Sequence, residues 1–210
     1  GLIGAGLTLW AMLWLAGSGR PALLLMAGLA VSSLSGAALA AVLNFAPNPF
    51  AMQELVFWLL GSVAERGMPH LVFLLPALVI GAFLIWRERR LLAALSLGEQ
   101  VASSLGLDYR RGGRLIILGV AILVGATVSV AGNIGFVGLI APHLARPLAQ
   151  NRPDRLLFPS AAIGAILVAL ADLVARLMPP GREIRLGVLT AFVGAPLFIW
   201  LIWKDRKQWL

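Results

Sequence analysis

The fold of this chain is decided by the stretch Gly132-Asn133-Ile134-Gly135-Phe136-Val137-Gly138-Leu139-Ile140-Ala141-Pro142-His143-Leu144-Ala145-Arg146. It is apolar enough to enter a membrane, yet it contains three glycines and a proline and ends in a basic residue. A helix that only faces lipid gains nothing from such residues, whereas small residues let helices pack closely inside a membrane bundle. The stretch therefore indicates one helix of a polytopic membrane protein.

The composition agrees with a membrane protein. Of the 210 residues, 60% are hydrophobic and only 12% are charged, with a mean hydropathy of +0.92, against about 45–50% and about 25% in soluble domains. The absence of cysteine excludes disulfides, thiolate zinc sites and a cysteine nucleophile. His70 and His143 lie far apart in the sequence and make a poor metal site, so we predict no metal and no directly bound cofactor.

The apolar runs predict an all-α transmembrane bundle of about six transmembrane helices plus an N-terminal remnant, since a helical span needs about 20 residues. The predicted segments are 2–16 (the remnant), 22–43, 71–86, 115–131, 134–145, 156–178 and 186–203. The run at 2–16 has no preceding basic region, so it does not resemble a signal peptide. Residues 52–60 are expected to form a short interfacial helix with Phe57 and Trp58 as anchors. We expect Pro142 to break or kink the segment 134–145.

Basic residues orient these segments, because cytoplasmic loops of membrane proteins are enriched in lysine and arginine. Of the 17 basic residues, one set of connections carries Arg20, Arg87, Arg89, Arg90, Arg110, Arg111, Arg114, Arg146, Arg152, Arg155, Lys204, Arg206 and Lys207. The opposite set carries Arg66, Arg176, Arg182 and Arg185. The first set is predicted to be cytoplasmic, and with it the C-terminus. This distribution also explains the net charge of +8 better than nucleic-acid binding does.

The longest predicted cytoplasmic loop, 87–114, contains a short helix. Ser96 and Glu99 have the spacing of a capping box, and Gly106 suits the left-handed position that ends a helix. Leu97, Val101 and Leu105 would share one face of the helix 97–105. Such a short helix needs a surface to pack on, which is either its own transmembrane domain or the groove of a cytoplasmic partner.

Several other residues have two interpretations. Asp172 and Arg176 stand at i,i+4 near the outer end of a span, as an intrahelical pair or as functional charges. Ser32, Ser33 and Ser35 suit helix packing or a weakly polar pathway. Gly132, Gly135 and Gly138 permit close helix contacts, and no Lys-Ser/Thr follows them as in a phosphate loop. Pro142 and His143 are expected to shape the inner end of their helix.

Four motifs together resemble the FecCD family, the permeases of ATP-binding cassette (ABC) importers for iron chelates and vitamin B12. They are Leu97-Gly98-Glu99-Gln100-Val101-Ala102 with Leu105-Gly106-Leu107; Gly135-Phe136-Val137-Gly138-Leu139 with Pro142-His143 and Arg146; Ala171 to Arg176; and Gly187-Val188-Leu189-Thr190-Ala191 with Gly194 to Leu201. They occur in the family's order, and the resemblance covers the whole chain. One departure is Glu183-Ile184-Arg185, where the family usually has a proline.

The resemblance implies the later part of a ten-helix permease subunit, forming one transmembrane domain over 1–210 with the coupling loop 87–114. Family subunits work as a pair of permeases on two cytoplasmic ATPases, which bind the ATP and magnesium, and receive substrate from a periplasmic binding protein. The implied function is import of a ferric siderophore or haem across the bacterial inner membrane. Vitamin B12 import is the first alternative and an ion-coupled secondary transporter the second. The chain itself carries no Walker motif or catalytic constellation and is not expected to be an enzyme.

The resemblance also implies roles for individual residues. Those implied to couple to the ATPase are Leu97, Gly98, Glu99, Gln100, Val101, Ala102, Leu105 and Gly106. Arg176 matches a position that meets the binding protein, and Arg182 and Arg185 could extend that basic rim. Ser32, Ser33 and Ser35 fall on the helix that lines the family's pathway, and Ser18 lies near its gate. Gly135, Gly138, Pro142, His143 and Asp172 form the structural signature.

Overall fold

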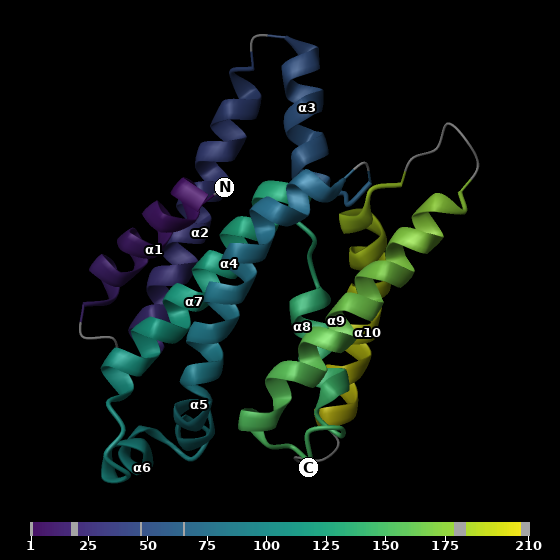
Figure 1. The fold of residues 1–210 in the computed structure, drawn as a ribbon. Helices are drawn as coiled ribbons and strands as arrows, with labels where there is room; N and C mark the ends of the chain where they lie inside the picture. The colour runs from purple at the N-terminus through teal and green to yellow at the C-terminus, as the bar shows by residue number, and fades with distance from the viewer. Residues whose placement is uncertain (1, 18–20, 47, 65, 179–183, 207–210) are drawn as a thin grey trace. The chain divides into compact units, whose positions relative to one another are not determined.

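The structure is a computed structural model that describes residues 2–17, 21–46, 48–64, 66–178 and 184–206. All regular secondary structure in these ranges is helical (Figure 1). The helices are α1 (Leu2–Ala16), α2 (Pro21–Asn44), α3 (Pro49–Leu60), α4 (Met68–Arg87), α5 (Arg89–Leu95), α6 (Glu99–Ser104), α7 (Tyr109–Ala131), α8 (Val137–Ala145), α9 (Pro153–Arg176) and α10 (Leu186–Arg206). The predicted all-α class is confirmed.

Four of these helices are long and apolar enough to cross a membrane by length and composition. They cover Leu23–Asn44, Met68–Arg87, Tyr109–Ala131 and Pro153–Arg176. Shorter apolar helices cover Leu2–Ala16, Pro49–Leu60 and Leu186–Trp200. Each predicted apolar segment therefore corresponds to one observed helix. The prediction omitted α5, a helix of seven residues between the end of α4 and the loop before α6.

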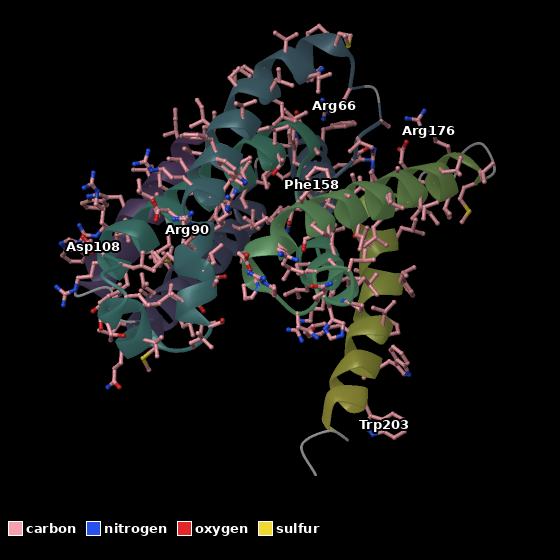
Figure 2. All side chains as sticks on the ribbon, turned by 60° about the horizontal axis from the view of Figure 1, so that its bottom comes forward. Arg66, Arg90, Asp108, Phe158, Arg176 and Trp203 are labelled. Atoms are coloured by element: carbon pink, nitrogen blue, oxygen red, sulfur yellow. The ribbon has the colours of Figure 1, made fainter. Side chains whose placement is uncertain are left out.

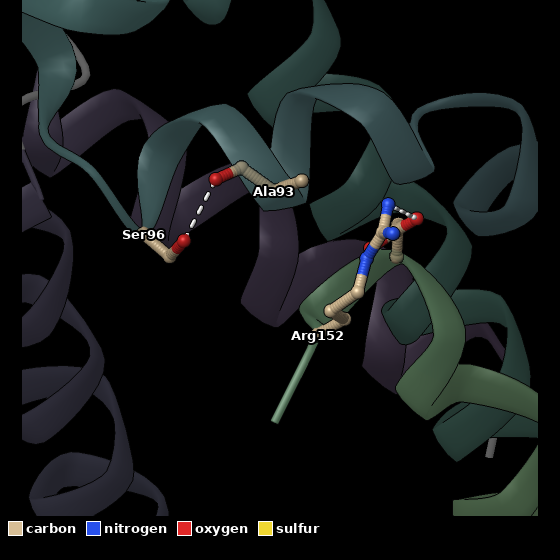
Figure 3. Close-up of polar contacts among 4 residues, drawn as sticks. Ala93, Ser96 and Arg152 are labelled. Carbon is tan, nitrogen blue, oxygen red and sulfur yellow. Dashed lines mark hydrogen bonds and ion pairs between the residues drawn. The ribbon is translucent and has the colours of Figure 1, made fainter. Parts of the chain in front are cut away.

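Local sequence explains where several helices begin. The side chain of Asn48 accepts a hydrogen bond from the amide of Ala51 at 2.7 Å, which caps α3. Pro153 opens α9, where a missing amide proton costs nothing. Asp154 follows in the first turn, where a negative charge is favourable, and Arg152 pairs with it at 3.0 Å (Figure 3). These signals start α9 three residues before the predicted segment.

The described residues form two compact units. The first comprises Gly1–Phe57 and Gly67–Val130, and the second Trp58–Arg66 and Ala131–Leu210. In the first unit, α4 and α7 approach each other at Gly81 and Gly119: a Cβ atom on either glycine would lie 2.9 Å from the other's carbonyl oxygen. In the second unit, α8, α9 and α10 contact one another.

Large apolar side chains on the spans are mostly exposed. Trp14 is 72% exposed, Phe158 84% and Phe192 78% (Phe158 is labelled in Figure 2). In water such a surface would aggregate. It is the surface expected of helices whose outer faces contact lipid, where apolar side chains need no burial against protein.

Of the break or kink predicted at Pro142 in α8, the break does not occur. The helix continues through Pro142 to Ala145, and His143 lies in its last turn. Its start is unusual instead: Phe136, the residue before the helix, has a left-handed backbone with φ of 65°. A large side chain rarely adopts this conformation. Gly194 of α10 accommodates it, because a Cβ atom there would lie 2.5 Å from the Cβ of Phe136.

Candidate functional site: the α6 helix, the pathway serines and the outer arginines

The helix α6 is held between two glycines that have positive φ. Gly98 precedes the helix with φ of 109° and ψ of 155°, a conformation open in practice only to glycine. Gly106 follows it with φ of 72°, as the sequence predicted. The amide of Gly106 donates to the carbonyl of Ser103, and that of Leu107 to the carbonyl of Ala102. These two bonds form a Schellman motif, which satisfies carbonyls that the helix leaves free.

One side of α6 is anchored to its own chain. Ala102 is fully buried in a cluster with Leu91 and Ala94 of α5. Leu107 and Tyr109 pack against the same cluster. The contact between Leu107 and Ala102 is the hydrophobic contact that accompanies a Schellman motif.

The other side of α6 is open. Leu97 is 69% exposed, Val101 37% and Leu105 62%. The sequence placed these three residues on one face and left open what that face contacts. Of the three, only Val101 belongs to α6, whereas Leu97 precedes Gly98 and Leu105 follows the last helical residue, so they form an exposed apolar surface around α6 and not one helix face. Gln100 is exposed beside it.

The predicted capping box is wrong. The hydroxyl of Ser96 donates to the carbonyl of Ala93 at 2.7 Å (Figure 3), and no side chain caps the start of α6. The reason is that α5 ends at Leu95, so the Ser96 hydroxyl bonds back to the preceding turn. The helix is correspondingly shorter than the predicted 97–105. Glu99 is its first residue, and the Glu99 side chain lies outside the described part.

Two of the predicted pathway serines line a hollow within the first unit. It has a volume of about 460 Å³ and lies between α1, α2 and α7, and a second, smaller hollow of about 360 Å³ lies at one end of α1 and α7. The larger one, the serine hollow, is lined by Ser32 and Ser35, together with Thr8, Met12 and Gly28. Ser33 is exposed but is not among the lining residues. Ser18 lies outside the described residues.

Two of the three hydroxyls that line the serine hollow are engaged by their own helices. Ser35 donates to the carbonyl of Val31 at 2.8 Å, and Thr8 donates to the carbonyls of Gly4 and Ala5 at 3.0 Å. Apart from Ser32, the remaining lining is apolar. None of the residues that line the hollow is charged.

The Asp172 and Arg176 side chains form the predicted i,i+4 pair. Arg176 Nε donates to Asp172 Oδ2 at 2.7 Å, with the arginine side chain 63% exposed and the aspartate 21%. Figure 2 shows Arg176 near the end of α9. Arg185 lies just before α10, where its carbonyl accepts hydrogen bonds from Val188 and Leu189. Arg182 lies outside the described residues.

Close packing within the chain explains only part of the glycine pattern. A Cβ atom at Gly132 would lie 2.9 Å from the Cα of Gly61. At Gly61 it would lie 2.6 Å from the carbonyl oxygen of Asn133, and at Gly187 it would collide with the carbonyl oxygen of Leu60. These three residues, the glycine junction, let three backbone segments of the second unit meet. By contrast, a Cβ atom at Gly135 or Gly138 would meet nothing within 4 Å. Those two are not close-packing positions in this chain.

Metal ligands do not converge in the part of the chain that the structure describes: no three His, Cys, Asp or Glu residues group there. His143 sits on α8, where its carbonyl accepts the amide of Arg146. Some residues that the structure brings together were not identified from the sequence. Thr8 and Met12 of the serine hollow and Gly61 of the glycine junction carry no local signal, because their roles arise from contacts between distant segments.

The fold and its exposed apolar helices define a multi-pass helical membrane protein. The FecCD transport family matches residues 1–204, and the chain belongs to this family. Among similar proteins are the vitamin B12 import system permease BtuC of Vibrio cholerae, 44% identical over 88% of this chain, and the hemin transport system permease HmuU of Yersinia pestis, 36% identical over 91%. A solved chain, described as an inward-facing conformation of a metal-chelate type ABC transporter, superposes with a TM-score of 0.85, 32% identity and 92% coverage.

The chain spans about half the length of the curated relatives it matches. It covers 55% of the Vibrio cholerae protein, 57% of the Yersinia pestis protein and 63% of the solved chain. The matched region includes α6, the serine hollow and the glycine junction.

Proposed function

We propose that this chain forms the later part of a permease subunit of an ABC importer in the bacterial inner membrane, with its C-terminus in the cytoplasm. The observation that carries the proposal is the exposed apolar surface of Leu97, Val101 and Leu105 in and beside the glycine-bounded helix α6, which is anchored through Ala102. An apolar surface of this kind fits a groove on a partner protein. The partner is a cytoplasmic ATPase, which supplies ATP hydrolysis, so the permease itself performs no catalysis.

The coupling step follows from how α6 is mounted. The helix is short and has few contacts of its own, so its position depends on the cluster formed by Leu91, Ala94 and Ala102. A force applied to the exposed surface passes through this cluster to α5 and to the start of α7, where Tyr109 touches it. Movement of the ATPase thereby shifts the spans between two arrangements that open on opposite sides.

The cargo we propose is an iron chelate, a ferric siderophore or haem, delivered by a periplasmic binding protein to a pair of permease subunits. The serine hollow supports a bulky cargo, because its lining is mostly apolar and two of its three hydroxyls are engaged. Arg176, Arg182 and Arg185 would form the basic rim that meets an acidic binding protein. Vitamin B12 is the second candidate, favoured by the 44% identity to the Vibrio cholerae B12 permease.

The ATPase partnership is tested by changing the exposed apolar surface. In the full-length subunit, Leu105→Asp places a charge in the apolar contact and is expected to abolish copurification of the ATPase. Ser103→Asp is the matched control, since Ser103 is exposed on α6 but outside this surface. Retained ATPase with Leu105→Asp, or equal loss with Ser103→Asp, would contradict the proposed contact.

The cargo is tested separately with the complete transporter in proteoliposomes that contain its binding protein. ATP-dependent uptake is measured for a radiolabelled ferric siderophore, haem and vitamin B12 in parallel. Uptake of either iron compound but not of vitamin B12 supports the iron-chelate proposal, and uptake of vitamin B12 alone overturns it. Uptake that continues without ATP and follows an ion gradient would overturn the importer proposal itself.

A further inference from the structure

The smaller hollow of the first unit combines aromatic and basic side chains at one end of the helices. It has a volume of about 360 Å³, and its distinctive lining residues are Trp10, Trp14, Tyr109, Arg110, Gly113 and Arg114. We call it the arginine cavity. Its walls are the last two turns of α1 and the first two turns of α7, and Leu24 of α2 contributes to it.

The two arginines have no acidic partner in the arginine cavity. No carboxylate lines it, and among the residues that the structure describes none forms an ion pair with Arg110 or Arg114. The nearest acidic residue in the sequence is Asp108 (labelled in Figure 2), whose Oδ1 accepts the backbone amides of Arg110 and Arg111 at 3.1 and 3.0 Å. That carboxylate caps α7, so the cavity keeps an excess of positive charge.

The aromatic side chains give the arginine cavity an apolar upper wall. The rings of Trp10 and Trp14 stack with centroids 6.4 Å apart and an angle of 14° between their planes, and both are more than half exposed. Tyr109 lies beside the arginines, with its hydroxyl 3.4 Å from Arg110 Nε. Tryptophan and tyrosine are enriched where membrane helices pass the lipid head groups. The charge pattern of the loops assigns this end of α1 and α7 to the cytoplasmic side.

Gly113 provides the space in the middle. A Cβ atom there would meet nothing within 4 Å, although a Cβ atom on the adjacent Gly112 would collide with Leu91. The helix α7 thus turns one glycine toward α5 for packing and leaves the next one open between Arg110 and Arg114. A group larger than water can approach the helix backbone at this point.

We propose that the arginine cavity binds an anionic phospholipid of the cytoplasmic leaflet. The phosphate lies between Arg110 and Arg114, over Gly113, and the start of an acyl chain lies along Trp10 and Trp14. Basic pockets between membrane helices on the cytoplasmic side suit anionic head groups, because their positive charges attract the phosphate. This proposal does not depend on which cargo the transporter carries.

The test is native mass spectrometry of the full-length subunit in detergent, titrated with phosphatidylglycerol, phosphatidylcholine or inorganic phosphate. Phosphatidylglycerol is expected to bind at least tenfold more tightly than phosphatidylcholine. The double variant Arg110→Gln/Arg114→Gln is expected to weaken phosphatidylglycerol binding roughly 30-fold, because each basic residue near an anionic surface contributes about 1 kcal/mol. Arg111→Gln removes a neighbouring charge that does not line the cavity and is expected to change binding less than twofold.

Two further variants separate the site from general charge and from misfolding. Gly113→Leu fills the cavity and keeps both arginines, and it is expected to weaken phosphatidylglycerol binding by tenfold or more with unchanged thermal stability. Arg110→Lys/Arg114→Lys keeps the charge and is expected to retain most of the binding. Equal affinity for both lipids, an equal effect of Arg111→Gln, or tight binding with Gly113→Leu would overturn the proposal. So would displacement of phosphatidylglycerol by millimolar inorganic phosphate, which would make the site one for free phosphate.

Discussion

Single glycines in this chain have distinct physical roles. At Gly98 the backbone conformation requires glycine although there is open space around it, whereas at Gly187 space is lacking. At Gly135 neither condition holds. The printed sequence shows 23 glycines without distinguishing these cases, so their roles become visible only from backbone angles and from contacts between distant segments.

Gly187→Ala is expected to destabilise the full-length subunit by about 1–3 kcal/mol, the usual cost of overpacking a tight contact. The added methyl group would collide with the carbonyl oxygen of Leu60 and lie 3.0 Å from that of Asn133. The measurement is thermal unfolding in detergent. Gly135→Ala is the matched control, and it should change stability by less than about 0.5 kcal/mol. Equal melting temperatures for the two variants would show that the glycine junction is not tightly packed.

Gly98→Ala is expected to disturb α6 without disturbing the spans. Alanine at φ of 109° costs about 1–3 kcal/mol of backbone strain, and it meets no other atom. Hydrogen exchange at the amides of 99–105 should therefore accelerate, and exchange in α7 should not change. Gly36→Ala, in the middle of α2 with open space around it, serves as the control. Unchanged exchange in α6 would mean that the Gly98 conformation does not determine how the helix starts.

At the scale of helices, α6 is an element whose stability comes from one small contact. Six residues are too few for a helix to persist alone in water. Ala102→Leu is expected to overpack the cluster with Leu91 and Ala94 and to displace α6, at a cost of about 1–3 kcal/mol. Limited proteolysis should then cut the segment 96–108 faster. Ser103→Ala, which removes only a hydroxyl bonded to Gln100, should leave the rate unchanged, and equal rates for both variants would contradict the anchoring role of Ala102.

The C-terminal end of α9 carries charges that contribute little to stability. Exposed i,i+4 pairs such as Asp172–Arg176 are worth about 0.3–0.5 kcal/mol, so Asp172→Asn should shift thermal unfolding very little. If Arg176 meets an acidic binding protein, Arg176→Glu should weaken docking roughly tenfold or more, because it replaces attraction by repulsion across the rim. The control Asp172→Asn should not weaken docking. Binding of the purified periplasmic protein to the full-length subunit measures both. If Asp172→Asn by itself also abolished docking, the binding protein would depend on the Asp172–Arg176 ion pair and not on Arg176 alone.

The helices were predictable because local sequence carries their signals. Long apolar runs, bounded by proline, glycine and arginine, place α2, α4, α7 and α9 within several residues of their observed ends. A short helix in this loop was also predicted, but it covers Glu99–Ser104 and not 97–105, so Leu97 and Leu105 are exposed beside it and do not share one helix face with Val101. The way in which α6 is held was not predictable, because the Ser96 hydroxyl bonds to the carbonyl of Ala93 and does not reach the start of α6. The local sequence is compatible with a Ser96 hydrogen bond to either helix, and the tertiary position of α5 determines which one forms.

At the scale of the whole molecule, the orientation in the membrane follows from charge alone. Thirteen of the 17 basic residues fall in one alternate set of connections, and moving such loops across a membrane is unfavourable. Besides the four described helices that are long enough to span, this alternation requires the shorter helices α8 and α10 to pass through the membrane as well. The arginine cavity, α6 and the C-terminus would then share the cytoplasmic side, which places the proposed lipid site and the ATPase contact at the same membrane surface.

This orientation can be tested with single cysteines, because the chain contains none of its own. Ser103→Cys on α6 and Ala64→Cys between α3 and α4 are both at exposed positions, and the charge distribution assigns them to opposite sides. In intact cells whose outer membrane has been permeabilised, a membrane-impermeant maleimide should label Ala64→Cys and leave Ser103→Cys unlabelled, since only the periplasmic face is open to the reagent. Inverted inner-membrane vesicles should give the reverse pattern. Labelling of Ser103→Cys from the periplasm would reverse the topology, and the ATPase contact, the binding-protein rim and the leaflet of the lipid site would all have to be reassigned.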